Sequence, residues 1–144
     1  MTELRADRVL VDGEAVGELV VLTAPLSLWG GLDAADGTVI DPRHPQHGAR
    51  LGGRIVALPV GRGSSSASSI LLESVRLGTA PSALLTLELD PILALGAVVA
   101  RELYGRWPVV AVLGAEAYGR LAVGSSARIE RGGRILVDEE AGGR

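Results

Sequence analysis

A short segment rich in glycine and serine is the part of this sequence best suited to chemistry. Residues 61–66 read Gly-Arg-Gly-Ser-Ser-Ser and stand between an apolar run at 54–59 and apolar residues that recur at helical spacing from Ile70 to Leu77. Glycine lets a backbone approach a ligand closely, and the first turn of a helix offers unpaired N–H groups and the positive end of its dipole. The pattern predicts a strand, a glycine loop and a helix whose start favours an anion.

Within this loop, Ser64 is the candidate catalytic residue. A serine hydroxyl is a poor base in water, but a positive environment stabilises its alkoxide, and an alkoxide can remove a proton next to a carboxylate. An N-cap role for Ser64 or Ser65 is the alternative, because serine is a preferred capping residue. Gly63, Ser65 and Ser66 are candidate substrate contacts. Arg62 could bind a carboxylate or phosphate, although a lone loop arginine is more often solvated.

A second group of polar residues lies in the glycine- and proline-rich stretch 23–53. It contains two histidines and three aspartates: His44, His47, Asp33, Asp36 and Asp41. These residues could hold a metal, or His44 could act as a general acid, but loop histidines and aspartates more often serve turns and local hydrogen bonds. We therefore expect no metal bound by this chain and keep only His44 and Asp33 as further site candidates. Trp29 is either a core anchor or an exposed docking residue.

The surrounding elements must hold the glycine loop in place. Apolar runs between turn residues predict strands at 8–10, 15–22, 38–40, 54–59, 82–87, 108–113, 127–131 and 134–137. The first two strands are expected to form a hairpin around Asp12-Gly13, and the last two form another across Gly132-Gly133. One helix follows the loop and ends at Gly78, and a second runs from the N-cap Asp90 to about Tyr104.

Length and composition predict one α/β domain over residues 1–144: a small barrel or sandwich of mixed strands with two or three outer helices. The chain has no cysteine, which excludes disulfides and thiolate ligands to zinc or an iron–sulfur cluster. Its net charge is -3 with dispersed basic residues, so we expect no nucleic-acid partner. No apolar run approaches the ~20 residues that span a bilayer, and the polar start has no secretion signal. We expect a cytoplasmic protein that binds no membrane.

Five motifs in order carry a resemblance to a known family. They are Pro25-Leu26-Ser27-Leu28-Trp29-Gly30-Gly31-Leu32-Asp33, Gly37 to Asp41, His44-Pro45 with Gly48, Gly61-Arg62-Gly63-Ser64-Ser65-Ser66, and Thr79-Ala80-Pro81. Together they resemble the small subunit, or swivel domain, of the aconitase X family. The similarity covers about residues 17–113 and leaves the hairpin 127–137 as a C-terminal extension.

The resemblance implies a swivelling β/β/α domain that is one subunit of a hydro-lyase. Known family members dehydrate mevalonate 5-phosphate or cis-3-hydroxy-L-proline. A separate or fused large subunit supplies most of the active site and any iron–sulfur cluster or divalent metal, so this chain would hold no cofactor and would be inactive outside a heterodimer. The family's proton-accepting serine is the first serine after the Gly-Arg-Gly triplet, which is Ser64 here.

One departure from the wider aconitase pattern affects substrate anchoring. True aconitases place an arginine two positions after this serine to bind a substrate carboxylate, whereas this chain has Ser66. Anchoring would then fall to Arg62, to backbone amides or to the partner. The rival interpretation is a non-catalytic anion-binding or regulatory swivel module, in which the serine loop only holds a phosphate or carboxylate, or in which His44 carries a phosphoryl group.

Overall fold

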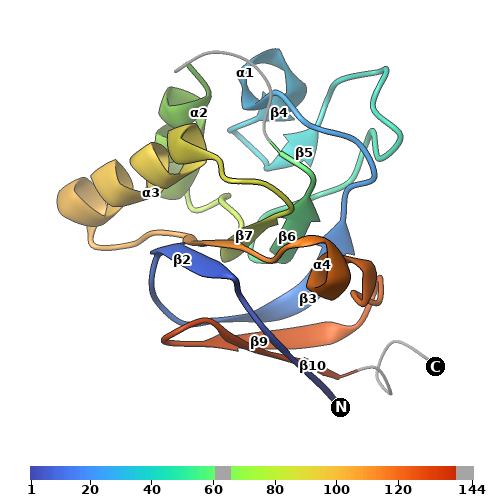
Figure 1. Ribbon diagram of the computed structural model, residues 1–144. Helices are drawn as coiled ribbons and strands as arrows, with labels where there is room; N and C mark the ends of the chain where they lie inside the picture. The colour runs from blue at the N-terminus through green and yellow to red at the C-terminus, as the bar shows by residue number, and fades with distance from the viewer. Residues whose placement is uncertain (61–65, 139–144) are drawn as a thin grey trace.

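The computed structural model describes residues 1–60 and 66–138 and shows a curled sheet with helices packed against its convex face (Figure 1). The eight strands of the sheet run in the order β1-β10-β9-β3-β6-β7-β8-β2. Their bounds are β1 Thr2–Arg5, β2 Arg8–Val11, β3 Ala15–Val21, β6 Ile55–Leu58, β7 Ala83–Thr86, β8 Val109–Val112, β9 Ser126–Glu130 and β10 Arg134–Asp138. A separate two-stranded ribbon consists of β4 Leu32–Asp33 and β5 Thr38–Val39. The predicted α/β class with mixed strands is confirmed.

The sheet curls so far that its two edge strands follow one another in the chain. β1 and β2 lie at opposite edges, yet only Ala6 and Asp7 separate them. The N–H of Ala6 donates to Gly133 O (2.9 Å), and the N–H of Asp7 donates to Val112 O (2.8 Å). These two bonds tie the β10 side of the sheet to the β8 side, which makes the sheet a half-barrel.

Two apolar clusters fill the two faces of this sheet. The cluster inside the curl is built from alternate residues of the strands, including Leu19, Ile55, Leu85 and Ile129. Several of its members are alanines, and small side chains suit the narrow interior of a small barrel. The second cluster lies between the convex face and the helices, where Leu58 and Leu84 of the sheet join residues of the helices.

Four helices are present among the described residues. Two of them were located from the sequence. The four are α1 Leu28–Gly31, α2 Ser66–Leu77, α3 Pro91–Tyr104 and α4 Ala115–Gly119. The predicted caps of α3 are confirmed: the Asp90 side chain accepts from the N–H groups of Ile92 and Leu93, and Gly105 ends the helix with a φ of 65°. In the described residues no helix is long and apolar enough to cross a membrane.

The predicted hairpin of 8–10 with 15–22 is wrong. β2 pairs with β8, whereas β3 pairs with β6 and β9. Asp12, between β2 and β3, accepts hydrogen bonds from Gly13 N and, far along the chain, from Gly132 N and the Trp107 indole. Residues 12–14 form an irregular connection between β2 and β3, and long-range pairing decides where each strand goes.

The hairpin across Gly132-Gly133 is confirmed, with β9 and β10 antiparallel. β1, α1, β4 and α4 were not predicted, because each is short and has no clear periodicity. Residues 139–144 lie outside the described residues.

Gly17 allows a close approach that a larger residue would break. A Cβ atom at Gly17 would lie 2.7 Å from the carbonyl oxygen of Gly53, next to the parallel pair of β3 and β6. We expect Gly17→Ala to lower the free energy of unfolding by about 1–3 kcal/mol, because backbone must shift to make room. Urea denaturation followed by circular dichroism measures this.

Gly119→Ala is the matched control, because a Cβ at Gly119 meets nothing within 4 Å. This variant should change the free energy of unfolding by less than about 0.5 kcal/mol. Equal stability of the two variants would show that the tight contact at Gly17 does not exist.

Candidate functional site

The candidate site lies at the edge of the sheet where the parallel strands β3, β6, β7 and β8 have their carboxyl ends. In sheets of this kind, ligands bind at the carboxyl edge, where the connections to the helices meet. Here α1 follows β3, α2 follows β6 and α3 follows β7, so these helices begin at this edge (Figure 1). The topology thus brings together the starts of these three helices, and α4, which follows β8, begins at the same edge.

The predicted site residues Arg62, Gly63, Ser64 and Ser65 lie outside the described residues. What the structure describes is the pair of elements on either side of them. β6 ends at Leu58, and α2 begins at Ser66, as the strand, loop and helix pattern predicted. Because α2 has 12 residues, its N-terminal N–H groups and dipole favour an anion at its start.

Backbone hydrogen bonds fix the chain just before the glycine–serine segment. Pro59 O accepts from the N–H groups of Leu87 (3.1 Å) and Glu88 (3.2 Å), which belong to the connection between β7 and α3. Near the start of α2, Gly96 of α3 approaches so closely that a Cβ there would lie 3.0 Å from Ser68 O. The elements that flank the segment are therefore held by neighbours on both sides.

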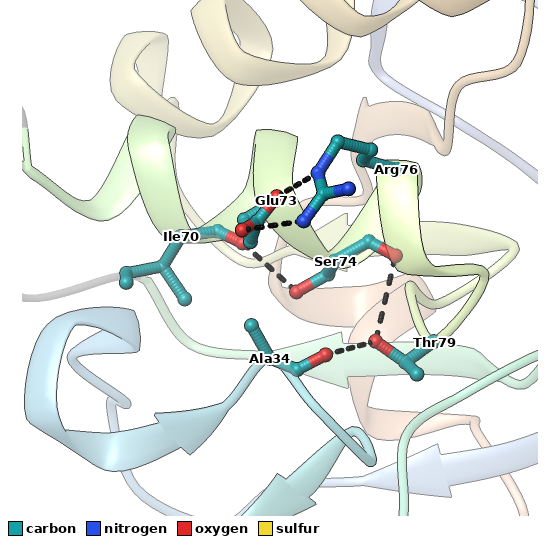
Figure 2. A network of polar contacts seen from close by, with 6 residues as sticks. All are labelled: Ala34, Ile70, Glu73, Ser74, Arg76 and Thr79. Atoms are coloured by element: carbon teal, nitrogen blue, oxygen red, sulfur yellow. Dashed lines mark hydrogen bonds and ion pairs between the residues drawn. The ribbon is translucent and has the colours of Figure 1, made fainter.

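The far end of α2 is held as well (Figure 2). The Ser74 hydroxyl donates to Ile70 O (2.9 Å), and the Thr79 hydroxyl donates to Ala34 O (2.6 Å), which ties the end of the helix to the stretch that contains β4 and β5. On the solvent side, Glu73 pairs with Arg76, and this hydrogen bond lowers the pKa of Glu73. α2 is thus a braced element.

His44 is fully engaged with backbone groups. Its side chain is 6% exposed, its Nε2 lies 3.0 Å from Ala24 O, and its Nδ1 accepts from the N–H of Gln46 (3.0 Å). A carbonyl only accepts, so Nε2 carries the proton and both ring nitrogens have partners. This arrangement ties the loop 41–48 to Ala24 and supports a structural role for His44.

Asp33 serves a turn in a similar way. Its Oδ1 accepts from Ala35 N (2.9 Å), and Asp36 and Asp41 accept from Thr38 N and Arg43 N in the same manner. Over residues 1–60 and 66–138, no group of three histidine, aspartate or glutamate side chains could hold a metal ion.

Two residues at this edge were not identified from the sequence. Thr86, the last residue of β7, is fully buried, and no described residue accepts from or donates to its hydroxyl. The signal in the sequence that could have identified Thr86 was a polar residue directly after the apolar run 83–85. Tyr118 of α4 donates to Leu22 O (3.2 Å) just after β3, and burial raises the pKa of Tyr118 to about 12, so the phenol keeps its proton at neutral pH.

Known proteins share this fold of a curled sheet with helices. The crystal structure of Thermococcus kodakaraensis aconitase X in its holo form matches with a TM-score of 0.82, covering 96% of this chain and 99% of that chain at 27% sequence identity. The profile of the aconitase X swivel domain matches residues 5–137, so the chain belongs to this family. The profile takes in the hairpin of β9 and β10, beyond the 17–113 segment that carries the motifs.

Two relatives indicate the enzymes in which this domain occurs. Cis-3-hydroxy-L-proline dehydratase of Pseudomonas aeruginosa is 54% identical over 99 residues, which are 69% of this chain and 17% of the relative. The phosphomevalonate dehydratase small subunit of Methanothermobacter thermautotrophicus is 40% identical over 93 residues, 65% of this chain and 71% of the relative. The matched region is thus a small part of the first relative and most of the second.

Thr86 provides a test of this edge. A buried hydroxyl without a partner costs about 1–3 kcal/mol, and an apolar group of the same shape removes that cost. We expect Thr86→Val to raise the free energy of unfolding of the isolated chain by about 1 kcal/mol. Thr86→Ser, which keeps the hydroxyl and loses a methyl group, should lower it by about 1 kcal/mol. If chemical denaturation finds Thr86→Val destabilised, the hydroxyl has a partner in the folded chain.

Proposed function

We propose that this chain is the small subunit of an aconitase X-type hydro-lyase that removes water from a small hydroxy acid. The observation that carries the proposal is the segment Gly61 to Ser66 placed between β6 and α2, in a chain 54% identical over 99 residues to a dehydratase. The enzyme names of the relatives, a dehydratase and a dehydratase small subunit, support both the reaction class and the division into subunits.

Ser64 is the proton acceptor in this proposal. As an alkoxide, stabilised by the N-terminal end of α2, its oxygen takes the proton from the carbon next to the substrate carboxylate. The carbon–hydrogen electron pair forms the new double bond, and the hydroxyl group on the neighbouring carbon leaves as water after it receives a proton. Gly63, Ser65 and Ser66 contact the bound acid, and Arg62 pairs with its carboxylate.

The remaining groups come from a large subunit. The protonation of the leaving hydroxyl needs an acid, and His44 is committed to Ala24 and Gln46. The chain has no cysteine to ligate an iron–sulfur cluster, and its described residues hold no trio of metal ligands, so a cluster or divalent metal of the enzyme would be held by the large subunit and would polarise the leaving hydroxyl there. The isolated chain is then inactive, and the complete enzyme is a heterodimer or a larger assembly of both subunits.

Cis-3-hydroxy-L-proline is the better substrate candidate of the two. The relative that acts on it is 54% identical, whereas the phosphomevalonate relative is 40% identical. Mevalonate 5-phosphate carries both a carboxylate and a phosphate, and such a ligand needs more positive charge than one carboxylate does. The segment 61–66 contains a single arginine, which suits the substrate with fewer negative charges.

Substitution of Ser64 tests the catalytic role. In the complex with the large subunit, Ser64→Ala should lower kcat by about 10²–10⁴-fold, because the general base is lost. Ser69→Ala is the matched control, since Ser69 is an exposed residue of α2, and it should leave kcat within about twofold. Turnover is measured as loss of cis-3-hydroxy-L-proline and of mevalonate 5-phosphate in parallel.

The same experiment distinguishes the catalytic role from the rival interpretation, a non-catalytic anion-binding module. If Ser64→Ala keeps full turnover in an assembled complex, the serine is not the base. If the wild-type complex dehydrates neither acid but Ser64→Ala weakens binding of a carboxylate, the chain is an anion-binding module.

A further inference from the structure

Trp29 is presented on the surface by a backbone that is held in place. Its side chain is 64% exposed, although its neighbours Leu28 and Gly31 are buried. α1 is a helix only in part: Trp29 has a ψ of 115° and Gly30 a φ of 81°, a left-handed conformation that favours glycine. This kink turns the indole away from the core. Leu28 and Leu32, on either side of it, belong to the core.

Three hydrogen bonds fix that kink. The Ser27 hydroxyl donates to Trp29 O (3.0 Å), and the N–H of Leu32 donates to Leu28 O. The N–H of Ile40 donates to Gly31 O (2.8 Å), which fastens the segment to the chain that follows β5. A braced backbone means that the indole is exposed in the resting fold and does not need to leave a core position to reach a partner.

Trp107, the other tryptophan of the chain, has partners within the fold. Its indole N–H donates to Asp12 O (2.8 Å), and the Arg101 guanidinium lies 5.8 Å from its ring centroid. For Trp29, no residue in 1–60 or 66–138 accepts from the indole N–H or places a cation over the ring. The two tryptophans differ in environment, and Trp29 has the features of an interface anchor, because aromatic residues dominate interface energetics.

The position of Trp29 indicates which surface a partner would cover. α1 packs against α2, and Leu28 shares an apolar cluster with Ala67 in the first turn of that helix. Figure 1 shows α1 beside α2 at the end of the molecule where the helices begin. Half-exposed apolar residues occur at the same edge: Ile40, bonded to Gly31, and Leu89, between β7 and α3.

We propose that Trp29 is the anchor through which the large subunit docks on this chain. The inference rests on the proposed function, in which the large subunit covers the carboxyl edge of the sheet. The length of the single-chain relative supports this occupant, because the region matched here is 17% of that polypeptide and the rest of it must pack somewhere. The large subunit should offer an apolar pocket with a hydrogen-bond acceptor for the indole N–H.

The test is the affinity of this chain for the aconitase X-type large subunit of the same organism. We expect Trp29→Ala to raise Kd by at least ~30-fold, the effect typical of a central interface residue. Trp29→Phe, which keeps a ring but lacks the N–H, should give a smaller increase. Leu103→Ala is the matched control: Leu103 is 62% exposed near the far end of α3, about 20 Å along the helix from its start, and its Kd should match the wild type.

Thermal unfolding of the isolated variants shows whether the role is structural. Trp29→Ala should shift the melting temperature by less than about 2 °C, whereas loss of a structural tryptophan would lower it far more. The inference is overturned if Trp29→Ala binds like the wild type, if Leu103→Ala weakens binding equally, or if Trp29→Ala unfolds early. A dimer of the isolated chain that depends on Trp29 would also overturn it.

The binding results distinguish a failure of the proposed function from a failure of the docking surface. If the wild-type chain does not bind the large subunit at all, both the proposed function and the docking surface are wrong. If the wild type binds and the complex dehydrates its substrate while Trp29→Ala binds equally well, the function stands and only the docking surface is wrong.

Discussion

The central strands β6 and β7 are buried on both faces, and the rest of the structure depends on this burial. All four residues of each strand are buried, alternately inside the curl and beneath the helices. Parallel pairing is typical of strands that are covered on both faces, and a parallel pair needs a crossover that returns the chain to the starting edge. α2 and α3 are those crossovers, so the connections leaving the carboxyl ends all open at one edge.

The elements around the carboxyl edge of the sheet are held firmly, whereas the edge itself is exposed. α2 is held at its end by the bond from Thr79 to Ala34 and near its start by the close approach of Gly96. The connection after β7 is fastened to Pro59. The edge in turn carries features that a closed, self-sufficient fold would avoid: a buried hydroxyl at Thr86 that no described residue satisfies, and the exposed indole of Trp29. Departures of this kind cluster at functional surfaces.

Local signals in the sequence predicted most of the scaffold, and long-range contacts account for what they missed. The caps at Asp90 and Gly78, the hairpin at Gly132-Gly133 and the buried strands β6, β7 and β8 each follow from a few neighbouring residues. The pairing of β2 with β8 instead of β3 follows from the curl of the whole sheet, which no local turn encodes. The exposure of Trp29 likewise depends on a kink fixed by Ile40, eleven residues away. The motif of Ser64 was visible in the sequence, and the catalytic role proposed for it rests on groups that a second protein would supply.

The chemistry of dehydration explains why such a domain would work with a partner. The reaction needs a base for the carbon-bound proton, an acid for the leaving hydroxyl and a holder for the carboxylate. The described residues offer the start of a braced helix, which suits the carboxylate and the base, but His44 is engaged with backbone and no trio of metal ligands is present among them. In the proposed enzyme the acid comes from the large subunit, and a rigid domain that moves as a unit would bring its half of the site to the other half. Under this proposal, closing the two halves around the substrate would exclude water and align the base with its proton, which would lower the barrier without any change inside the small domain.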